Sequence, residues 1–346
     1  MNEQAFLDAL ARFSPAVRQA FIDAVQDITD NAILAQVVEA LEAGDADRAW
    51  RALGYNPSIW NRFVATLTAT FEHGATMAMQ VLPKYATGPD GVKSMLRFNI
   101  RDREAERWLQ EESGTLITRI ENEMRTSVRN TMQAGLAEGR NPRSTALDII
   151  GRVDPSTGKR EGGVLGLGER EEYWSRSTRT KLLTLDESYF DLDLRDKRFD
   201  ATVRKAIETG KPLPAATVDK LVDRYRANAL RFRGEQIART ETLAALNRSE
   251  FEAVRQSQAQ TGLPAAAFTK EWDDAGDSKV RHSHRELGRL GPIQFDQPFV
   301  SPVTGAMMMH PGDTSLITDP NLAARERIGC RCRVKYRTNF GYNVGG

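Results

Sequence analysis

The residues best suited to bind a metal ion are concentrated near the C-terminus of this 346-residue sequence. Three of its four histidines and both of its cysteines lie between residues 282 and 332. Thiolate sulfur and imidazole nitrogen are ligands that zinc prefers, and a small domain rich in loops is stabilised by a bound metal. We therefore predict a structural Zn²⁺ site formed by His284, His310, Cys330 and Cys332. The alternative is a pair of buried free cysteines with surface histidines.

A second group of residues has side chains suited to acid–base or phosphate chemistry. Glu241 lies in a long predicted helix, and Asp277, Arg281 and His284 follow in the next segment. Gathered in one pocket, they would suit a nuclease or an ADP-ribosyltransferase-like effector. A helix cap, a salt bridge and a pair between Arg239 and Glu241 explain the same residues without catalysis. We favour this second interpretation and expect no enzymatic activity.

Charge is unevenly distributed along the chain, although the formal net charge is only +1. Residues 1–50 carry nine acids and three bases, whereas residues 321–346 carry six Lys or Arg and one Glu. Lys and Arg along one face provide affinity for the phosphates of DNA, whatever the base sequence. The predicted DNA contacts are Arg195, Lys197, Arg198, Arg204, Lys205, Arg331, Arg333, Lys335 and Arg337.

The periodicity of apolar residues predicts a mainly α-helical protein with a small α+β domain at the C-terminus. Three- and four-residue spacing predicts long helices over 102–138 and 215–257, and Ser14-Pro15 predicts a helix start. Short apolar pieces between Gly and Pro residues after position 264 indicate strands. We predict a helical docking region over 1–99, long helical arms over 100–260 with a glycine-rich loop at 151–168, and the α+β domain over 261–346.

Several classes of protein are disfavoured by composition. No apolar run approaches the roughly 18 residues of a membrane-spanning helix, and the first residues lack the pattern of a secretory signal. Two cysteines cannot form a disulfide framework, so a reducing compartment fits. The glycine-rich loop matches neither the phosphate-binding nor the dinucleotide-binding pattern. An amphipathic segment at 57–84 leaves a membrane-active ejection protein as a further alternative.

The order of these motifs resembles the MuF-type head morphogenesis domain of tailed bacteriophages. The resemblance covers roughly residues 100–337 and is most specific in its C-terminal part, in Ile237–Asn247, in the segment from Trp272 to His284, in Phe299, in the HPGD of His310–Asp313 and in the CRC of Cys330–Cys332. The segments 161–168 and 189–200 also resemble the family's middle region. One departure is Gly329, because family members usually carry Asn before the CRC.

The resemblance implies a minor head protein inside the phage capsid. Such proteins are associated with the portal vertex, contribute to head assembly and are required for infectious particles. The expected partners are the portal protein, other head proteins and packaged double-stranded DNA, held through backbone contacts or at ejection. The expected location is the interior of the virion head, and the cytoplasm of the bacterial host during assembly.

Overall fold

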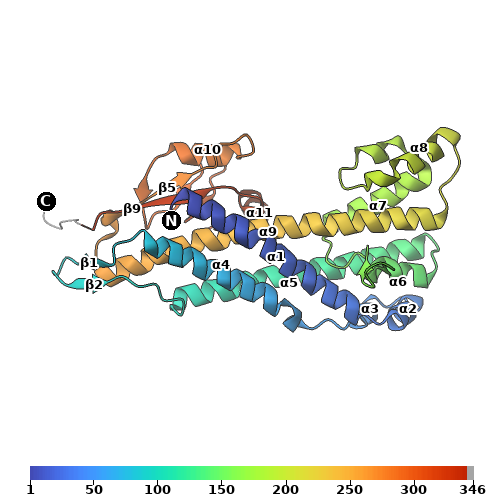
Figure 1. Cartoon of the computed structure of the whole chain (residues 1–346), viewed down its shortest axis with the longest axis horizontal. Coiled ribbons are helices and arrows are strands. Elements are labelled where there is room, and N and C mark those ends of the chain that lie inside the picture. Colours follow the sequence, from blue (N-terminus) through green and yellow to red (C-terminus); the bar gives the residue numbers. More distant parts are fainter. Residues whose placement is uncertain (341–346) are drawn as a thin grey trace. The chain divides into compact units, whose positions relative to one another are not determined.

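The computed structural model describes residues 1–340, and within that range the regular structure is mainly helical (Figure 1). The longest helices are α1 (Glu3–Asn31), α4 (Asn61–Gln80), α5 (Arg103–Ala137) and α9 (Ala215–Thr261). The shorter ones are α2 (Leu34–Glu42), α3 (Ala46–Arg51), α6 (Pro142–Ile150), α7 (Glu169–Thr184), α8 (Asp200–Thr209), α10 (His282–Arg289) and α11 (Pro320–Arg327). Turns of 3-10 helix lie at Pro57–Trp60, Glu187–Asp191, Lys197–Phe199 and Ala265–Ala267. The predicted fold class is confirmed.

The two long helices predicted from apolar spacing are present as α5 and α9, with nearly the predicted bounds. The predicted helix start at Ser14-Pro15 is wrong, because α1 continues through Pro15 without interruption. Phe13 and Val17, on either side of the proline, are both buried. Burial of this apolar face therefore holds α1 together where the local signal favours a break. No helix in the described part of the chain is long and apolar enough to cross a membrane.

The described residues form two compact units, each assembled from discontinuous segments. The first contains residues 1–17, residues 64–111 and the chain from residue 236 on; the second contains residues 18–63 and 112–235. Helix α9 therefore contributes its N-terminal part to the second unit and its C-terminal part to the first. The predicted division into docking region, arms and C-terminal domain follows sequence order instead, and it stays a prediction about how the chain works.

The first unit contains the predicted strands. Strand β5 (Phe268–Asp273) is the centre of an antiparallel sheet, between β6 (Ile293–Gln294) and β9 (Arg333–Thr338). Side chains of β5 alternate between buried and half-buried, as expected of a strand with one face on a core. Strands β7 (Phe299–Val300) and β8 (Met307–Met308) form a separate hairpin. Helix α10 lies against β5 (Figure 1).

The main core of the first unit joins residues from both ends of the chain. Phe6 and Phe13 of α1 and Leu243 and Leu246 of α9 pack with the C-terminal sheet and its loops. The C-terminal contributors are Trp272, Val280, Leu287, Phe299, Ala306, Met308, Cys330, Cys332 and Val334. Both cysteines are therefore core residues.

Four further short strands form two hairpins. They pair as β1 (Tyr85–Thr87) with β2 (Lys93–Met95) in the first unit, and as β3 (Arg152–Val153) with β4 (Arg160–Glu161) in the second. The second hairpin is the start of the predicted glycine-rich loop. Its glycines allow close packing: a Cβ on Gly162 would lie 2.4 Å from the Cβ of Asp223 in α9. The glycines thus bring the loop against a helix.

Candidate metal centre

Three of the four predicted metal ligands lie together in the core of the first unit. His284 belongs to α10, and Cys330 and Cys332 lie just before β9. The Nδ1 atom of His284 is 3.5 Å from Sγ of Cys330 and 3.4 Å from Sγ of Cys332, and each residue is about 1% exposed. Zinc bond lengths place a sulfur and a nitrogen ligand about 3.6 Å apart in a tetrahedral site. The geometry of these three side chains fits a zinc ion.

A carboxylate holds the histidine ring from its other side. The Nε2 atom of His284 lies 2.8 Å from Oε2 of Glu326 in α11, and the Ser283 hydroxyl donates to the same oxygen at 3.2 Å. Histidine ligands of metals commonly bond a carboxylate through their second nitrogen, because this fixes the ring and strengthens the ligand. Trp272 packs edge-on against the His284 ring, with centroids 5.1 Å apart. Glu326 is therefore suited to orient His284, leaving Nδ1 directed at the sulfurs.

The electrostatics of this cluster favour one thiolate. Burial lowers the pKa of His284, but hydrogen bonds to Cys330 and Glu326 outweigh burial and raise the pKa to about 9. The hydrogen bond from Cys332 lowers the pKa of Cys330, against its burial, and the His284 ring lowers it further. The pKa of Cys332 is raised, first by the hydrogen bond to Cys330 and then by burial. These shifts favour the thiolate form of Cys330, which is the form that binds a metal cation.

His310, the fourth predicted ligand, does not lie in this cluster. It is buried against Phe251 of α9, with ring centroids 5.6 Å apart, and its Nδ1 lies 3.1 Å from the Pro311 carbonyl oxygen. Burial lowers the pKa of His310 to about 4, so the ring is neutral near pH 7. Proximity in sequence did not bring His310 to the cysteines, because its ring packs on Phe251 instead.

The HPGD motif has a structural explanation of its own. The Asp313 carboxylate accepts hydrogen bonds from the backbone of Met309 at 2.8 Å and of Ser315 at 2.9 Å, which closes the turn. Gly312 has φ +86°, and a Cβ there would lie 3.1 Å from the Cβ of Ala244 in α9. The motif therefore forms a tight turn that packs directly on the helix.

The residues of the predicted catalytic group contact one short segment, Glu326–Cys332, which we call the closing segment. Arg327 forms an ion pair with Glu241, Arg331 pairs with Asp277, and Arg281 donates to the carbonyl of Ile328. His284 contacts Glu326 and both cysteines, as described above. The structure therefore distributes Glu241, Asp277, Arg281 and His284 along the segment, each with its own partner. Glu241 and His284 are buried at 2% and 1% exposure.

Two further contacts fasten the closing segment to α9. The backbone N–H of Gly329 donates to the Thr240 hydroxyl at 3.1 Å, and the Asn247 side chain donates to the carbonyl of Cys332 at 3.1 Å. Gly329 has φ +66°, a conformation that Gly and Asn adopt more readily than other residues. Glycine at position 329 can therefore adopt the same left-handed backbone conformation as an asparagine would. No sequence pattern marks Thr240, Asn247 and Glu326 as partners, because only the fold brings them to the cysteines and their neighbours.

Six of the nine predicted DNA contacts are paired with carboxylates. Their partners are Asp200 for Arg195, Asp196 for Arg198, Asp277 for Arg331, Asp273 for both Arg333 and Lys335, and Glu271 for Arg337. Arg204 lies over the ring of Phe190, and Lys197 and Lys205 are exposed. The four basic residues between 331 and 337, which we call the basic tail, are therefore all paired with carboxylates of the first unit. This pairing weakens the prediction that the basic tail binds DNA.

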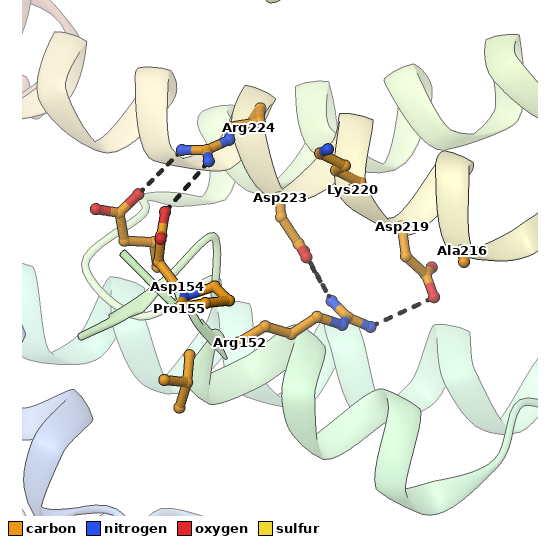
Figure 2. Close-up of a pocket in the computed structure, with 10 residues that line it drawn as sticks. Arg152, Asp154, Pro155, Ala216, Asp219, Lys220, Asp223 and Arg224 are labelled. Carbon is orange, nitrogen blue, oxygen red and sulfur yellow. Dashed lines mark hydrogen bonds and ion pairs between the residues drawn. The ribbon is translucent and has the colours of Figure 1, made fainter. Parts of the chain in front are cut away.

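The second unit contains a pocket of about 430 Å³ that the sequence did not predict. It lies between the β3–β4 hairpin and the N-terminal part of α9 (Figure 2). Arg152 bonds both carboxylate oxygens of Asp223 at 2.8 Å and pairs with Asp219 at 3.5 Å, while Arg224 pairs with Asp154 at 3.2 Å. These charged side chains are paired with one another, so they are not available to bind a charged ligand. We interpret the pocket as a space beside an ion-pair network.

A buried lysine in β5 is expected to reduce the stability of the first unit near neutral pH. Lys270 is fully buried among the rings of Phe251, Phe295 and Phe299, and its Nζ donates to the carbonyl of Met309 at 2.9 Å. Burial lowers its pKa to about 8. Lys270 therefore binds its proton more tightly in the unfolded chain than in the folded chain between about pH 8 and 10, and its own contribution to stability rises with pH across that range.

Lys270→Met should therefore stabilise the protein by about 1–2 kcal/mol at pH 7, because it removes a buried charge and costs one hydrogen bond. The gain in stability over the wild type should therefore shrink as pH rises from 8 to 10, because the wild-type lysine loses its charge there. Urea unfolding at several pH values measures both effects, with Lys279→Met, at an exposed position, as the control. A variant that is less stable than wild type at pH 7, by an amount that does not change between pH 8 and 10, would contradict this account.

Comparison with known proteins supports the resemblance seen in the motifs. Residues 197–335 match the family model described as Phage Mu protein F like protein. No curated protein and no solved structure matches the chain. The matched region includes the Thr240–Glu241 pair, α10, the HPGD turn and the closing segment, and it ends within β9; residues 100–196, which the motifs also suggested, lie outside it. The resemblance predicted from the motifs is therefore confirmed over residues 197–335, which are similar to a family of phage head-related proteins.

Proposed function

We propose that this chain is a structural minor head protein of a tailed phage, associated with the portal vertex inside the capsid and needed for head assembly. Its partners are the portal protein, other head proteins and the packaged double-stranded DNA. It is made in the cytoplasm of the bacterial host and ends in the virion. The match of residues 197–335 to the phage Mu protein F like family supports the phage role. The structural role is supported by the motif residues, which all bond the closing segment: Thr240, Glu241, Asn247, Asp277 and His284.

A structural zinc ion is part of this proposal. His284, Cys330 and Cys332 would hold the ion, Glu326 would orient His284, and the metal would join α10 to the closing segment. A bound zinc ion supplies a cross-link between segments that are distant in sequence. Because the three ligands are buried, the geometry favours a structural role over a catalytic one.

The two alternative functions receive less support. An enzyme would need Glu241, Asp277, Arg281 and His284 around one accessible space, whereas each has its own partner in the closing segment. A membrane-active protein would need the apolar side of residues 57–84 to be free. Phe63, Leu67 and Phe71 of that segment are buried within the fold.

Assembly of phage heads tests the proposed function. Heads produced with and without this chain should differ in infectivity, and quantitative mass spectrometry should find the chain in purified heads in a few copies, together with the portal. Glu241→Gln keeps the shape of the side chain and should still enter heads if its role is structural. A chain absent from purified heads, or a Glu241→Gln variant that enters heads but loses a nuclease or transferase activity of the wild type, would overturn the proposal.

A further inference from the structure

The β1–β2 hairpin of the first unit carries exposed cations that have no carboxylate partner. Lys84, Lys93 and Arg97, which we call the hairpin cations, are all exposed, and none forms an ion pair within residues 1–340. The nearest acidic residue in the hairpin is Asp90, whose carboxylate accepts from the backbone of Val92 at 3.0 Å in the turn. This arrangement contrasts with the basic tail, whose cations are neutralised by neighbouring carboxylates.

An exposed aromatic ring organises two of these cations. Tyr85 is 42% exposed, and the ammonium groups of Lys84 and Lys93 lie 5.8 and 5.1 Å from its ring centroid. Cation–π attraction of this kind restrains flexible lysines on one side of the hairpin. In the strand register Tyr85 is opposite Met95 and Thr87 is opposite Lys93, so these four side chains share one face. The face combines positive charge, a ring and a hydroxyl.

The hairpin is fastened firmly to the end of α9 (Figure 1). Gln260 accepts from the backbone N–H of Arg97 at 2.9 Å and donates to its carbonyl at 2.6 Å. Gln256, one helical turn earlier, makes the same two bonds to Asn99 at 2.8 and 3.1 Å. Gly88 lies so close to the helix end that a Cβ would be 2.4 Å from the Thr261 carbonyl oxygen. The charged face is therefore held in place before any partner binds, which reduces the entropy cost of binding.

We propose that this hairpin face binds the phosphate backbone of double-stranded DNA. A two-stranded ribbon is narrow enough for the major groove, and unpaired cations provide salt-dependent affinity for phosphates. The inference rests on the DNA contact within the proposed function and assigns it to residues 84–97, which lie outside the region matched by the family. The Tyr85 ring positions the two lysines.

Binding of the full chain to a fluorescent mixed-sequence duplex of about 30 base pairs, over a series of salt concentrations, tests this assignment. The variant Lys84→Gln/Lys93→Gln/Arg97→Gln should bind about tenfold more weakly near 100 mM salt and lose about 2–3 units of the salt slope. A matched variant, Lys159→Gln/Lys211→Gln/Lys279→Gln, removes the same charge from other exposed positions and should change binding little. Circular dichroism checks that both variants are folded.

Three results would overturn the assignment, and they are distinguishable. If the wild type binds DNA and only Lys197→Gln/Arg204→Gln/Lys205→Gln weakens binding, the hairpin assignment fails while the DNA contact of the proposed function stands. If the wild type does not bind duplex DNA, both fail. If the hairpin variant loses binding only to vesicles of phosphatidylglycerol and phosphatidylcholine, the face recognises lipid headgroups instead.

Discussion

Cys330→Ser/Cys332→Ser is expected to remove the bound metal and to lower the stability of the first unit sharply. Serine hydroxyls do not ionise near neutral pH and are poor zinc ligands, so His284 alone would remain. At a free zinc concentration a thousandfold above Kd, a site present only in the folded state stabilises it by about 4 kcal/mol. We expect a loss of that order, with about one zinc ion per chain in the wild type and none in the variant.

Elemental mass spectrometry measures the metal, and thermal unfolding followed by tryptophan fluorescence measures stability, because Trp272 packs on His284. His310→Gln is the matched control: it changes the predicted ligand that lies elsewhere, so it should keep the metal even if it is less stable. Loss of zinc from a folded His310→Gln variant would support the predicted site with four ligands, His310 included. A wild type without zinc in metal-replete medium would leave the three side chains as a buried thiol–imidazole cluster.

The sequence was sufficient for the fold class and for most of the metal cluster, because both depend on local patterns. Apolar spacing of three and four residues marks α5 and α9 directly, and Cys-x-Cys places two sulfurs on one face where the backbone is extended. The error over His310 has a different origin. His310 and His284 are similar in type and close in sequence, but the HPGD turn packs on Phe251, and only tertiary structure decides which histidine meets the cysteines.

Charge patterns were harder to interpret from the sequence. A run of Arg and Lys in β9 predicts a basic surface, yet its partners, Asp273 and Glu271, are contributed by β5, the neighbouring strand. In contrast, the three hairpin cations are scattered over fourteen residues, so no local run reveals them. Carboxylates on a neighbouring strand can neutralise a dense run of basic residues, and a hairpin can bring together basic residues that are far apart in the sequence. Pro15 shows the same rule for helices, because burial on both sides overrides a local start signal.

Asp148→Asn is expected to destabilise the second unit by about 3–5 kcal/mol, because it removes the one carboxylate that four arginines share. Asp148 is buried at 3% exposure and lies 3.0 Å from Arg226, 2.9 Å from Arg140, 3.3 Å from Arg152 and 3.5 Å from Arg179. Asparagine keeps the shape of the side chain but cannot balance these charges. Arg226 is itself only 3% exposed, so it would be left with a weaker partner in the interior.

The pH dependence separates this mechanism from a simple packing defect. Burial raises the pKa of Asp148, but the arginines, Arg226 first, outweigh it and lower the pKa below the ordinary value of 3.8. The unfolded chain then binds the proton more tightly, so the stabilisation is present above about pH 4 and is lost as pH falls through the folded-state pKa. Urea unfolding should show this acid loss in the wild type, and Asp148→Asn should show a smaller one, because other carboxylates with lowered pKa values remain. Asp186→Asn, at an exposed turn of the same unit, controls for the chemical change and should cost about 1 kcal/mol or less. If the two variants lose the same free energy of unfolding, the arginine network contributes no more to stability than the exposed hydrogen bond of Asp186.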